Sequence, residues 1–362
     1  MPAAAVVLSV TYGRFLSPYY WSWFLGSQDM ALPVVHIARL GGDLIIPALL
    51  ALSGSAPAIL LVQLPPSSAT VAVALASILV VAGALTFGFA SYRRSVARVE
   101  AGETVRVAAV AASPVEFDEK APAYSDIEGT IARYQPHIAR AIAQGARLIV
   151  LPEYAVETTP HNREQWLAAV SRWARDGHAR IVAGLGCADP HQDQLVIADE
   201  TGQIAVTYDK QHPAPGVEPK PEKRTPPALL EGDPFPVSAV VCVDMDYADV
   251  ARPVAQTDGV LAVPANDWEE IVEMHHRSAV WNTVMAGAPV VRSAGHGISA
   301  VYDAAGRVVA QANSLDGPVV LVADVPIPLP ATRSAHAKHA NGQQITPLRG
   351  SGADQASDTA RR

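Results

Sequence analysis

Two long apolar runs near the N-terminus constrain this chain more than any other feature. The segments "LIIPALLALSGSAPAILLVQL" (44–64) and "ATVAVALASILVVAGALTFGFA" (69–90) contain no charged side chain. Each has about the 20 residues that a helix needs to cross the hydrocarbon core of a bilayer. Small residues are frequent in both, as in packed transmembrane helices. The sequence therefore predicts two transmembrane helices, joined by the short uncharged connection "PPSS", rather than two buried helices of a soluble core.

The residues around these runs set the limits of the membrane region. Segment 17–26, "SPYYWSWFLG", has the Tyr and Trp content typical of a membrane interface. We assign residues 1–94 to the membrane region and residues 95–103, which are more polar, to a linker. At the other end of the chain, residues 327–362 are polar and rich in Ala, Ser and Gly, so we expect a disordered tail.

Between the linker and the tail, residues 104–326 have the pattern of an α/β domain. Apolar runs of strand length occur at 104–112, 146–153, 179–187, 194–199, 203–210, 236–242, 258–265, 288–294, 297–303, 307–312 and 319–325. Helical spacing occurs at 125–145, 163–175 and 269–287. The turn "DAAG" (303–306) predicts a hairpin between two of the strands.

Composition and motifs exclude several classes of function. The net charge is −8 and no basic stripe occurs, so we expect no nucleic-acid partner. The two cysteines, Cys187 and Cys242, are too few for a disulfide framework or a zinc site, and the eleven histidines are scattered. The segment "GLGCAD" (184–189) lacks the third glycine of a dinucleotide-binding loop. The sequence therefore predicts neither a metal nor a cofactor.

Three reactive side chains follow predicted strands. Glu153 ends "RLIVLPE", Lys210 ends "IAVTYDK" and Cys242 ends "VSAVVC". Loops at strand ends are where a rigid scaffold holds reactive groups. A carboxylate can take the thiol proton, the thiolate can attack a carbonyl, and an ammonium and a backbone N–H can stabilise the oxyanion. Together the three residues predict nucleophilic catalysis at a carbonyl group.

This chemistry places demands on the site, and each residue also has a structural interpretation. An ordinary glutamate, with a pKa near 4.3, is a weak base for a thiol with a pKa near 8.5. We therefore expect burial to strengthen Glu153 as a base and Lys210 to lower the pKa of Cys242. Alternatively, Glu153 caps a helix, Lys210 is a solvated loop cation and Cys242 is a core residue. We interpret Cys187, which has no acidic follower, as a core residue.

The ordered motifs "LPEY", "YDKQHPAPGVE" and "VVCVDMDY" resemble the Glu–Lys–Cys triad of the nitrilase (carbon–nitrogen hydrolase) superfamily. Within it, the chain most resembles the bacterial apolipoprotein N-acyltransferases. The resemblance continues through "ANDWEE" and "APVVRSAGHGISAVYDAAGRVVAQ" and covers about residues 20–326. It implies an α/β fold: a four-layer αββα sandwich over residues 104–326, preceded by a transmembrane helical region.

The resemblance also implies roles for individual residues. It makes Glu153 the general base, Lys210 the oxyanion lysine and Cys242 the nucleophile. Glu218 matches a second glutamate that the acyltransferases need, although in isolation it reads as an exposed loop carboxylate. Asp244 stands where the family has Glu, and on its own it could cap a helix.

Other positions are supporting candidates or depart from the family pattern. Val243 replaces an aromatic residue, and Met285 in "NTVM" (282–285) replaces a glutamate. Trp268 in "ANDWEE" is a candidate for substrate binding, and His212 and His296 are candidates to line the pocket. The membrane region has two good spans where the family has a larger set, and a polar tail where the family has a final helix.

The function implied by the resemblance is acyl transfer through a cysteine thioester. The donor is a phospholipid and the acceptor is the N-terminal cysteine amine of a lipoprotein. The resemblance also implies a bacterial inner-membrane protein whose catalytic domain faces out of the cytoplasm. Local charges predict the reverse orientation, because arginines precede and follow the hairpin, namely Arg14, Arg39, Arg93, Arg94 and Arg98.

Two alternatives stay open. A membrane-tethered amidase or nitrilase would use the same triad but hydrolyse a small C–N bond, with water resolving the thioester. A non-catalytic paralogue would bind a lipid or a partner only. Val243, Met285 and the smaller membrane region favour this last interpretation, whereas the intact Glu153, Lys210 and Cys242 oppose it.

Overall fold

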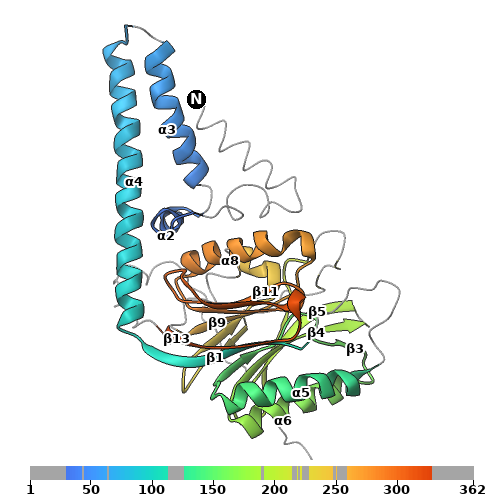
Figure 1. Ribbon diagram of the computed structural model, residues 1–362. Coiled ribbons are helices and arrows are strands. Elements are labelled where there is room, and N and C mark those ends of the chain that lie inside the picture. Colours follow the sequence, from blue (N-terminus) through green and yellow to red (C-terminus); the bar gives the residue numbers. More distant parts are fainter. Residues whose placement is uncertain are drawn as a thin grey trace, which may run out of the picture. The chain divides into compact units, whose positions relative to one another are not determined.

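A helical hairpin leads into two β-sheets in the computed structural model (Figure 1). The structure describes residues 30–42, 45–62, 65–112, 126–188, 191–213, 218, 221, 228–247, 250 and 259–327. The aromatic segment 17–26 and residues 328–362 of the expected tail lie outside the described residues.

Both predicted membrane spans are helices. Helix α3 covers Ile45–Val62 and helix α4 covers Ser68–Glu100, and each is long and apolar enough to cross a membrane. Ser67 caps α4, since its Oγ accepts a hydrogen bond of 3.1 Å from the backbone N–H of Thr70. Side chains such as Val62 and Leu79 leave 84% and 71% of their surface exposed. An exposed apolar surface of this kind suits a lipid environment.

Helix α4 extends further than the sequence indicates. The expected linker, residues 95–103, is helical up to Glu100, and strand β1 begins at Glu103. The helix continues because Val99 packs against Ala304 and Ala305 of the sheet domain. Gly102 completes the connection, because a Cβ atom there would collide with the carbonyl oxygen of Ile327. The helix and the sheet domain are thus joined without a separate linker.

The first sheet has the strand order β13-β1-β2-β4-β5-β6, and β3 pairs with β4. Strand β1 is parallel to β2 and antiparallel to β13, with Val107 opposite both Leu148 and Ala323. The strands are β1 (Glu103–Ala111), β2 (Leu148–Val150), β3 (Glu157–Thr158), β4 (Arg180–Ala188), β5 (His191–Ala198), β6 (Ile204–Asp209) and β13 (Val319–Ile327).

The second sheet has the order β12-β11-β10-β9-β8-β7. The predicted hairpin at 303–306 joins β11 and β12, which are antiparallel. The strands are β7 (Ala228–Leu230), β8 (Val237–Ala239), β9 (Val260–Ala265), β10 (Val290–Ala294), β11 (Ile298–Tyr302) and β12 (Val308–Asn313). Strands β8, β9 and β10 are parallel. Parallel strands buried on both faces explain why these segments read as continuous apolar runs.

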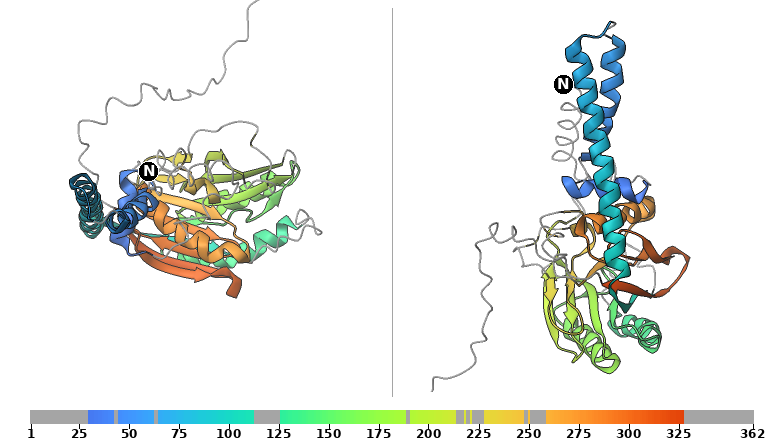
Figure 2. Two further views of the ribbon diagram at one scale, coloured as in Figure 1. Left: turned by 90° about the horizontal axis from the view of Figure 1, so that it is seen from above. Right: turned by 90° about the vertical axis from the view of Figure 1, so that its left-hand side faces the viewer.

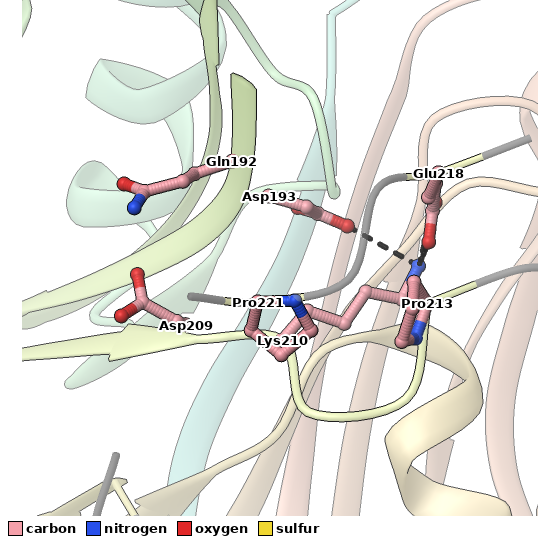
Figure 3. A pocket seen from close by; sticks show the side chains of 7 residues that line it. All are labelled: Gln192, Asp193, Asp209, Lys210, Pro213, Glu218 and Pro221. Atoms are coloured by element: carbon pink, nitrogen blue, oxygen red, sulfur yellow. Dashed lines mark hydrogen bonds and ion pairs between the residues drawn. The ribbon is translucent and has the colours of Figure 1, made fainter. Parts of the chain in front are cut away.

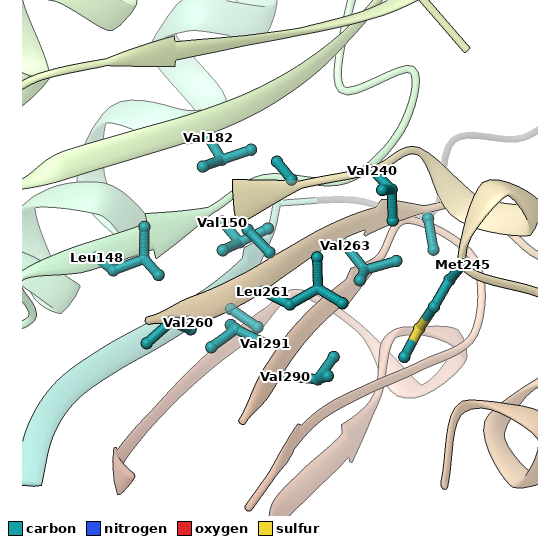
Figure 4. Packing of buried hydrophobic residues seen from close by; sticks show 14 of the residues in the cluster. Leu148, Val150, Val182, Val240, Met245, Val260, Leu261, Val263, Val290 and Val291 are labelled. Carbon is teal, nitrogen blue, oxygen red and sulfur yellow. The ribbon is translucent and has the colours of Figure 1, made fainter. Parts of the chain in front are cut away.

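The main hydrophobic core lies between the two sheets. Leu148 and Val150 of the first sheet pack in one cluster with Leu261, Val263 and Val291 of the second (Figure 4). Each such side chain contributes about 1.5–3 kcal/mol when it is removed from water. This packing holds the edges of the two sheets, and the loops that follow their strands, in fixed relative positions.

Helices cover the outer faces of both sheets. Helices α5 (Ile127–Ala143) and α6 (Arg163–Gly177) lie on the first sheet, and α8 (Val272–Ala286) lies on the second (Figures 1 and 2). In α5 the buried positions recur at helical spacing, as at Tyr134, Ile138 and Ala141. The predicted αββα sandwich is therefore confirmed.

A short helical segment ahead of α3 was not expected from the sequence. Helix α2 (Leu32–Val35) packs against α4, and the 3-10 helix η2 (His36–Leu40) packs against α8. The buried His36 ring donates through Nε2 to the carbonyl of Ala305 and accepts through Nδ1 from the hydroxyl of Ser91, each at 3.1 Å. This ring therefore connects α4 to the turn between β11 and β12.

Candidate active site

Cys242 lies in a sharp turn just beyond a strand. The predicted strand over 236–242 ends at Ala239, and Cys242 begins the 3-10 helix η4 (Cys242–Asp246). Its φ angle is +48°, a left-handed conformation that is uncommon for residues other than glycine. Such conformations carry backbone strain and cluster at functional sites. The thiol is buried, with Sγ 3.9 Å from the carbonyl oxygen of Asn266.

Lys210 follows β6 and is the centre of a buried group of charges. Its Nζ lies 2.7 Å from Glu153, 2.7 Å from Glu218 and 3.2 Å from Asp193. Figure 3 shows Asp193 and Glu218 both directed at this nitrogen. The exposed fractions of the Lys210, Glu153 and Glu218 side chains are 3%, 2% and 9%. The interpretations of Lys210 as a solvated cation and of Glu218 as an exposed carboxylate are therefore wrong.

Glu153 reaches this group from the loop after β2. Its carboxylate contacts Lys210 rather than capping a helix. Gly184 of β4 makes the approach possible, because a Cβ atom there would lie 2.6 Å from the Cα of Glu153. The next residue, Tyr154, has a φ angle of +50°, and burial raises the pKa of its phenol. The backbone around Glu153 is thus held by close packing.

Asp244 joins the loop of the lysine to the loop of the cysteine. Its carboxylate accepts hydrogen bonds from the backbone N–H groups of Gln211 (3.0 Å) and His212 (2.8 Å). It also accepts one from the hydroxyl of Tyr208 (2.8 Å) and lies 3.0 Å from Nδ1 of His212. Asp244 is fully buried, so it does not cap a helix as the alternative interpretation proposed. It fixes the position of Lys210 relative to Cys242.

A second buried network, which the sequence interpretation missed, lies on another side of Cys242. Nη2 of Arg292 donates to both carboxylate oxygens of Asp267, at 2.6 and 2.8 Å. His275 Nδ1 lies 2.6 Å from the same carboxylate. Burial alone would raise the pKa of Asp267, but Arg292 and His275 outweigh it and lower the pKa to about 2. The sequence feature that could have revealed this network is Arg292, a charged residue within the apolar run "VVRSA".

The thiol of Cys242 does not have the lowered pKa that we expected. Burial raises its pKa well above the ordinary value, and the nearby Glu153 adds to this effect. Lys210 and Arg292 act in the opposite direction but do not compensate. The prediction is therefore wrong for the free protein, because loss of hydration outweighs the attraction of the ammonium. With its pKa raised in this way, the thiol would need a base to act as a nucleophile.

The supporting candidates have different environments. Val243 is buried in η4, whereas Trp268 leaves 40% of its surface exposed. The ring of His212 stacks on Tyr247 at 3.6 Å between centroids. The carbonyl oxygen of His296 accepts from the N–H of Asp267. The roles of these residues in substrate binding stay predictions.

Two further positions are explained by their contacts. Cys187 is partly buried at the margin of a hydrophobic core, against which it packs, and its Sγ lies 2.7 Å from a guanidinium nitrogen of Arg163. Met285 packs with Trp281 near η2, so the position that is glutamate in the family serves packing between α8 and the N-terminal helices here.

Two sets of donor atoms lie close enough together to hold a metal ion by distance alone. They are Glu153, Asp193 and Glu218, and Cys242, Asp267 and His275, with donor atoms within 4.8 Å of one another in each set. In the first set the ammonium of Lys210 already contacts all three carboxylates. In the second, Arg292 contacts both oxygens of Asp267. In both sets, a cationic side chain of the protein already contacts carboxylate oxygens that a metal ion would use.

Comparison with known proteins gives three kinds of match. The carbon–nitrogen hydrolase family matches residues 106–333. The apolipoprotein N-acyltransferase of Azotobacter vinelandii is 25% identical over 335 residues, which cover 82% of this chain and 61% of that protein. The same enzyme of Pseudomonas putida is 26% identical over 328 residues, which cover 83% and 63%. The chain thus spans less than two thirds of the length of these relatives.

Solved structures confirm the fold. An amidase from Nesterenkonia sp. is similar with a TM-score of 0.51 and 20% identity, over 62% of this chain and 91% of the amidase. A mutant of the Nesterenkonia amidase, with a TM-score of 0.50 and 20% identity over 61% and 90% of the two chains, shows covalent addition of the acetamide moiety of fluoroacetamide at its active-site cysteine. At this level of sequence identity, the similarity shows a shared fold and nothing more.

Proposed function

Because the chain belongs to the carbon–nitrogen hydrolase family, we propose that it is a membrane-bound acyltransferase. It moves a fatty acyl group from a phospholipid to the N-terminal amine of a lipoprotein, through a thioester on Cys242. The observation that carries the proposal is the direct continuation of the apolar helix α4 into β1, which lies beside β2, the strand that precedes Glu153. The names of the relatives, which are apolipoprotein N-acyltransferases, support it.

The first half of the reaction acylates the enzyme. The carboxylate of Glu153 takes the proton of the Cys242 thiol, and Sγ attacks the ester carbonyl of the phospholipid. The negative charge that develops on the carbonyl oxygen is stabilised by Nζ of Lys210 and by the backbone N–H of Val243. When the intermediate collapses, the C–O bond breaks and Glu153 returns the proton to the departing lysophospholipid alcohol. A thioester on Cys242 remains.

The second half transfers the acyl group. The amine of the acceptor attacks the thioester carbonyl and gives a proton to Glu153. The C–S bond breaks, the sulfur receives that proton, and the amide leaves. The same carboxylate thus serves as base and then as acid in each half, so no net proton is consumed at the site.

We further propose that the sheet domain lies on the extracytoplasmic face of the bacterial inner membrane, as the resemblance to the apolipoprotein N-acyltransferases implies. Arg39 precedes the helical hairpin, and Arg93, Arg94 and Arg98 follow it, so the local charges alone favour the opposite orientation. Both substrates of the proposed reaction are lipids, and a hairpin that holds the domain at the bilayer lets them react without leaving it.

A second candidate is a membrane-tethered amidase that hydrolyses a small C–N bond. The observation that favours it is the polar pocket beside Lys210, which is lined by Gln192, Asp193, Asp209 and Glu218 among the described residues (Figure 3). This pocket is too small for a long acyl chain. Water would then resolve the thioester.

One experiment distinguishes these functions. The purified full-length protein is incubated with a phospholipid that carries an isotope-labelled acyl chain, and its peptides are examined by mass spectrometry. We expect the labelled acyl group on Cys242. An adduct that forms with small amides but not with phospholipid would select the amidase. The lack of any adduct would select the non-catalytic protein.

A further inference from the structure

Among the residues that the structure describes, the group of charges around Lys210 contains more negative than positive charge. Three buried carboxyl groups, those of Glu153, Asp193 and Glu218, lie within 3.2 Å of one ammonium. If all were ionised, this buried group would carry an excess of two negative charges. A buried carboxylate without a compensating partner takes up a proton instead. This imbalance among the described residues favours a bound proton on one of the three carboxyl groups.

Asp193 has the weakest contacts of the three carboxyl groups that could stabilise a negative charge. Its contact with Lys210 is 3.2 Å, whereas Glu153 and Glu218 each lie 2.7 Å from the same nitrogen. Its side chain is 4% exposed. Among the described residues no backbone or side-chain donor makes a regular hydrogen bond to either of its oxygens. A hydrogen bond between Asp193 and Glu153 requires a proton on one of them, because two ionised carboxylates are both acceptors.

Two other described residues near Asp193, Tyr154 and Asp209, do not offset its charge. The nearby phenol of Tyr154 is neutral, since burial raises its pKa. Burial, and then the charge of Glu153, raise the pKa of Asp193 well above the ordinary value, although Lys210 opposes them. Asp209 lines the same pocket, but its carboxylate points away from Lys210 (Figure 3). Electrostatics and geometry thus agree on the position of the proton.

We propose that Asp193 is a positioning residue that keeps one proton and donates it in a hydrogen bond to Glu153, the carboxylate proposed to receive the proton of Cys242. This inference rests on the proposed role of Glu153 as the base. During the reaction the S–H bond of Cys242 breaks and an O–H bond forms on Glu153, while the proton of Asp193 stays where it is. The group around Lys210 gains the proton that Cys242 loses, so the total charge of the group and Cys242 together is unchanged by this transfer.

The proton on Asp193 also explains how a thiolate can form in this environment. With Asp193 neutral, the group has an excess of one negative charge instead of two. When the proton of Asp193 is lost at alkaline pH, the added negative charge opposes the formation of the thiolate nearby. The reactivity of Cys242 should then rise less steeply with pH than that of a variant in which residue 193 cannot ionise.

The substitution Asp193→Asn tests this, because asparagine has the shape of a protonated aspartate and keeps a donor for Glu153. The first measurement is the infrared spectrum of the full-length protein at neutral pH. We expect the carbonyl band of one protonated carboxyl group in the wild type, absent in Asp193→Asn and retained in the control Asp209→Asn. Identical spectra for all three proteins at neutral pH would overturn the proposal.

The second measurement is the rate at which iodoacetamide alkylates Cys242, followed by mass spectrometry over a range of pH. At neutral pH we expect Asp193→Asn to react within about twofold of the wild type, since both carry a neutral group at position 193. At alkaline pH the variant should become the faster of the two. A variant that is already about tenfold faster at neutral pH would show that Asp193 is ionised there, and would overturn the proposal.

Both measurements are independent of the acyl substrate. A failure to acylate Cys242 with phospholipid would therefore contradict the proposed function but not the proton on Asp193. If instead the infrared and alkylation results contradict the proton on Asp193, the proposed acyl transfer is unaffected. If Asp193→Asn does not fold, the wild type labelled with 13C-aspartate gives the same answer. The band of the protonated carboxyl group must then shift on labelling, and a band that does not shift assigns the proton to a glutamate.

Discussion

Asp244 accepts a hydrogen bond of 2.8 Å from the backbone N–H of His212, a residue 32 positions earlier in the chain. His212 follows Lys210 by two residues, and Asp244 follows Cys242 by two. The distance between the lysine and the thiol is therefore set by a buried carboxylate rather than by contact between the two groups. This arrangement leads to the first prediction.

We expect Asp244→Asn to destabilise the fold by about 1–3 kcal/mol, because one N–H donor of the lysine loop then faces an amide NH2 group. Acylation of Cys242 should fall by more than about tenfold as Lys210 shifts. Urea unfolding and acyl-enzyme formation measure the two effects. The exposed Asp176→Asn is the control, and equal behaviour of the two variants would contradict the role of Asp244.

Glu218→Gln should lower acylation by about tenfold or more, because it removes one of the two carboxylates that hold Lys210 at 2.7 Å. The matched control is Glu231→Gln, which changes an exposed carboxylate and should stay within about twofold. The measurement is the initial rate of thioester formation. A loss no larger for Glu218→Gln than for the control would mean that its contact with Lys210 has no catalytic consequence.

Arg292→Met should destabilise the protein by about 3–5 kcal/mol, because the buried carboxylate of Asp267 loses its guanidinium partner. The double variant Arg292→Met with Asp267→Leu should recover part of this loss, which a double-mutant cycle in urea detects. A double variant that is less stable than Arg292→Met would contradict the interpretation.

The same pair gives the wild type a defined response to acid. The pKa of Asp267 is lowered to about 2, so the folded state binds its proton more weakly than the unfolded state. This stabilisation is present above the ordinary pKa of about 4 and is lost as the pH falls toward 2. Unfolding in urea between pH 5 and pH 2, with the Asp267→Asn variant as reference, measures it. A reference variant that loses as much stability as the wild type over this range would contradict the assignment.

Cys242 should react slowly with iodoacetamide at neutral pH, because burial raises its pKa. The rate should increase as the pH rises beyond the ordinary thiol value, as the thiolate forms. Cys187, which is partly exposed, should be alkylated first. Peptide mapping assigns each modification. Cys242→Ser should abolish acylation and Cys187→Ser should not, so an acyl group found on Cys187 would overturn the mechanism.

The orientation of the sheet domain can be read from a reporter fused after Pro328. With the domain outside the cytoplasm, a fused alkaline phosphatase should be active and a fused green fluorescent protein should not fluoresce after export by the general secretion route. The reverse result would show that the arginines around the hairpin determine the orientation.

Much of the fold could be predicted because it depends on local patterns. The apolar runs at 44–64 and 69–90 became α3 and α4, and the α/β segment formed the expected sandwich. Strands β3 and β7 were missed because two or three residues carry no periodicity. The end of α4 was missed because its last turns are polar in sequence and are stabilised by packing against Ala304 and Ala305.

The sequence indicated where the candidate residues lie relative to the strands, but it did not reveal their electrostatics. Glu153, Lys210 and Cys242 follow strands, which is a pattern that a sequence displays. The raised pKa of Cys242 depends on burial by residues distant in the chain, which no local pattern reveals. Asp193 and Arg292 were missed for a related reason, since a single charged residue in a strand reads as one that faces solvent.

The length of α4 has a consequence for the geometry of the reaction. A helix of 33 residues is about 50 Å long, whereas the hydrocarbon core of a bilayer is about 30 Å thick. If the apolar part of α4 fills that core, the polar turns after Ala90 act as a rigid spacer that sets the height of the sheets above the lipid. The ester bond of a phospholipid lies at the membrane interface. In the proposed reaction, α4 therefore sets the distance between the sheet domain and the bilayer. That distance determines how far a phospholipid must move out of the bilayer for its ester carbonyl to reach Sγ of Cys242.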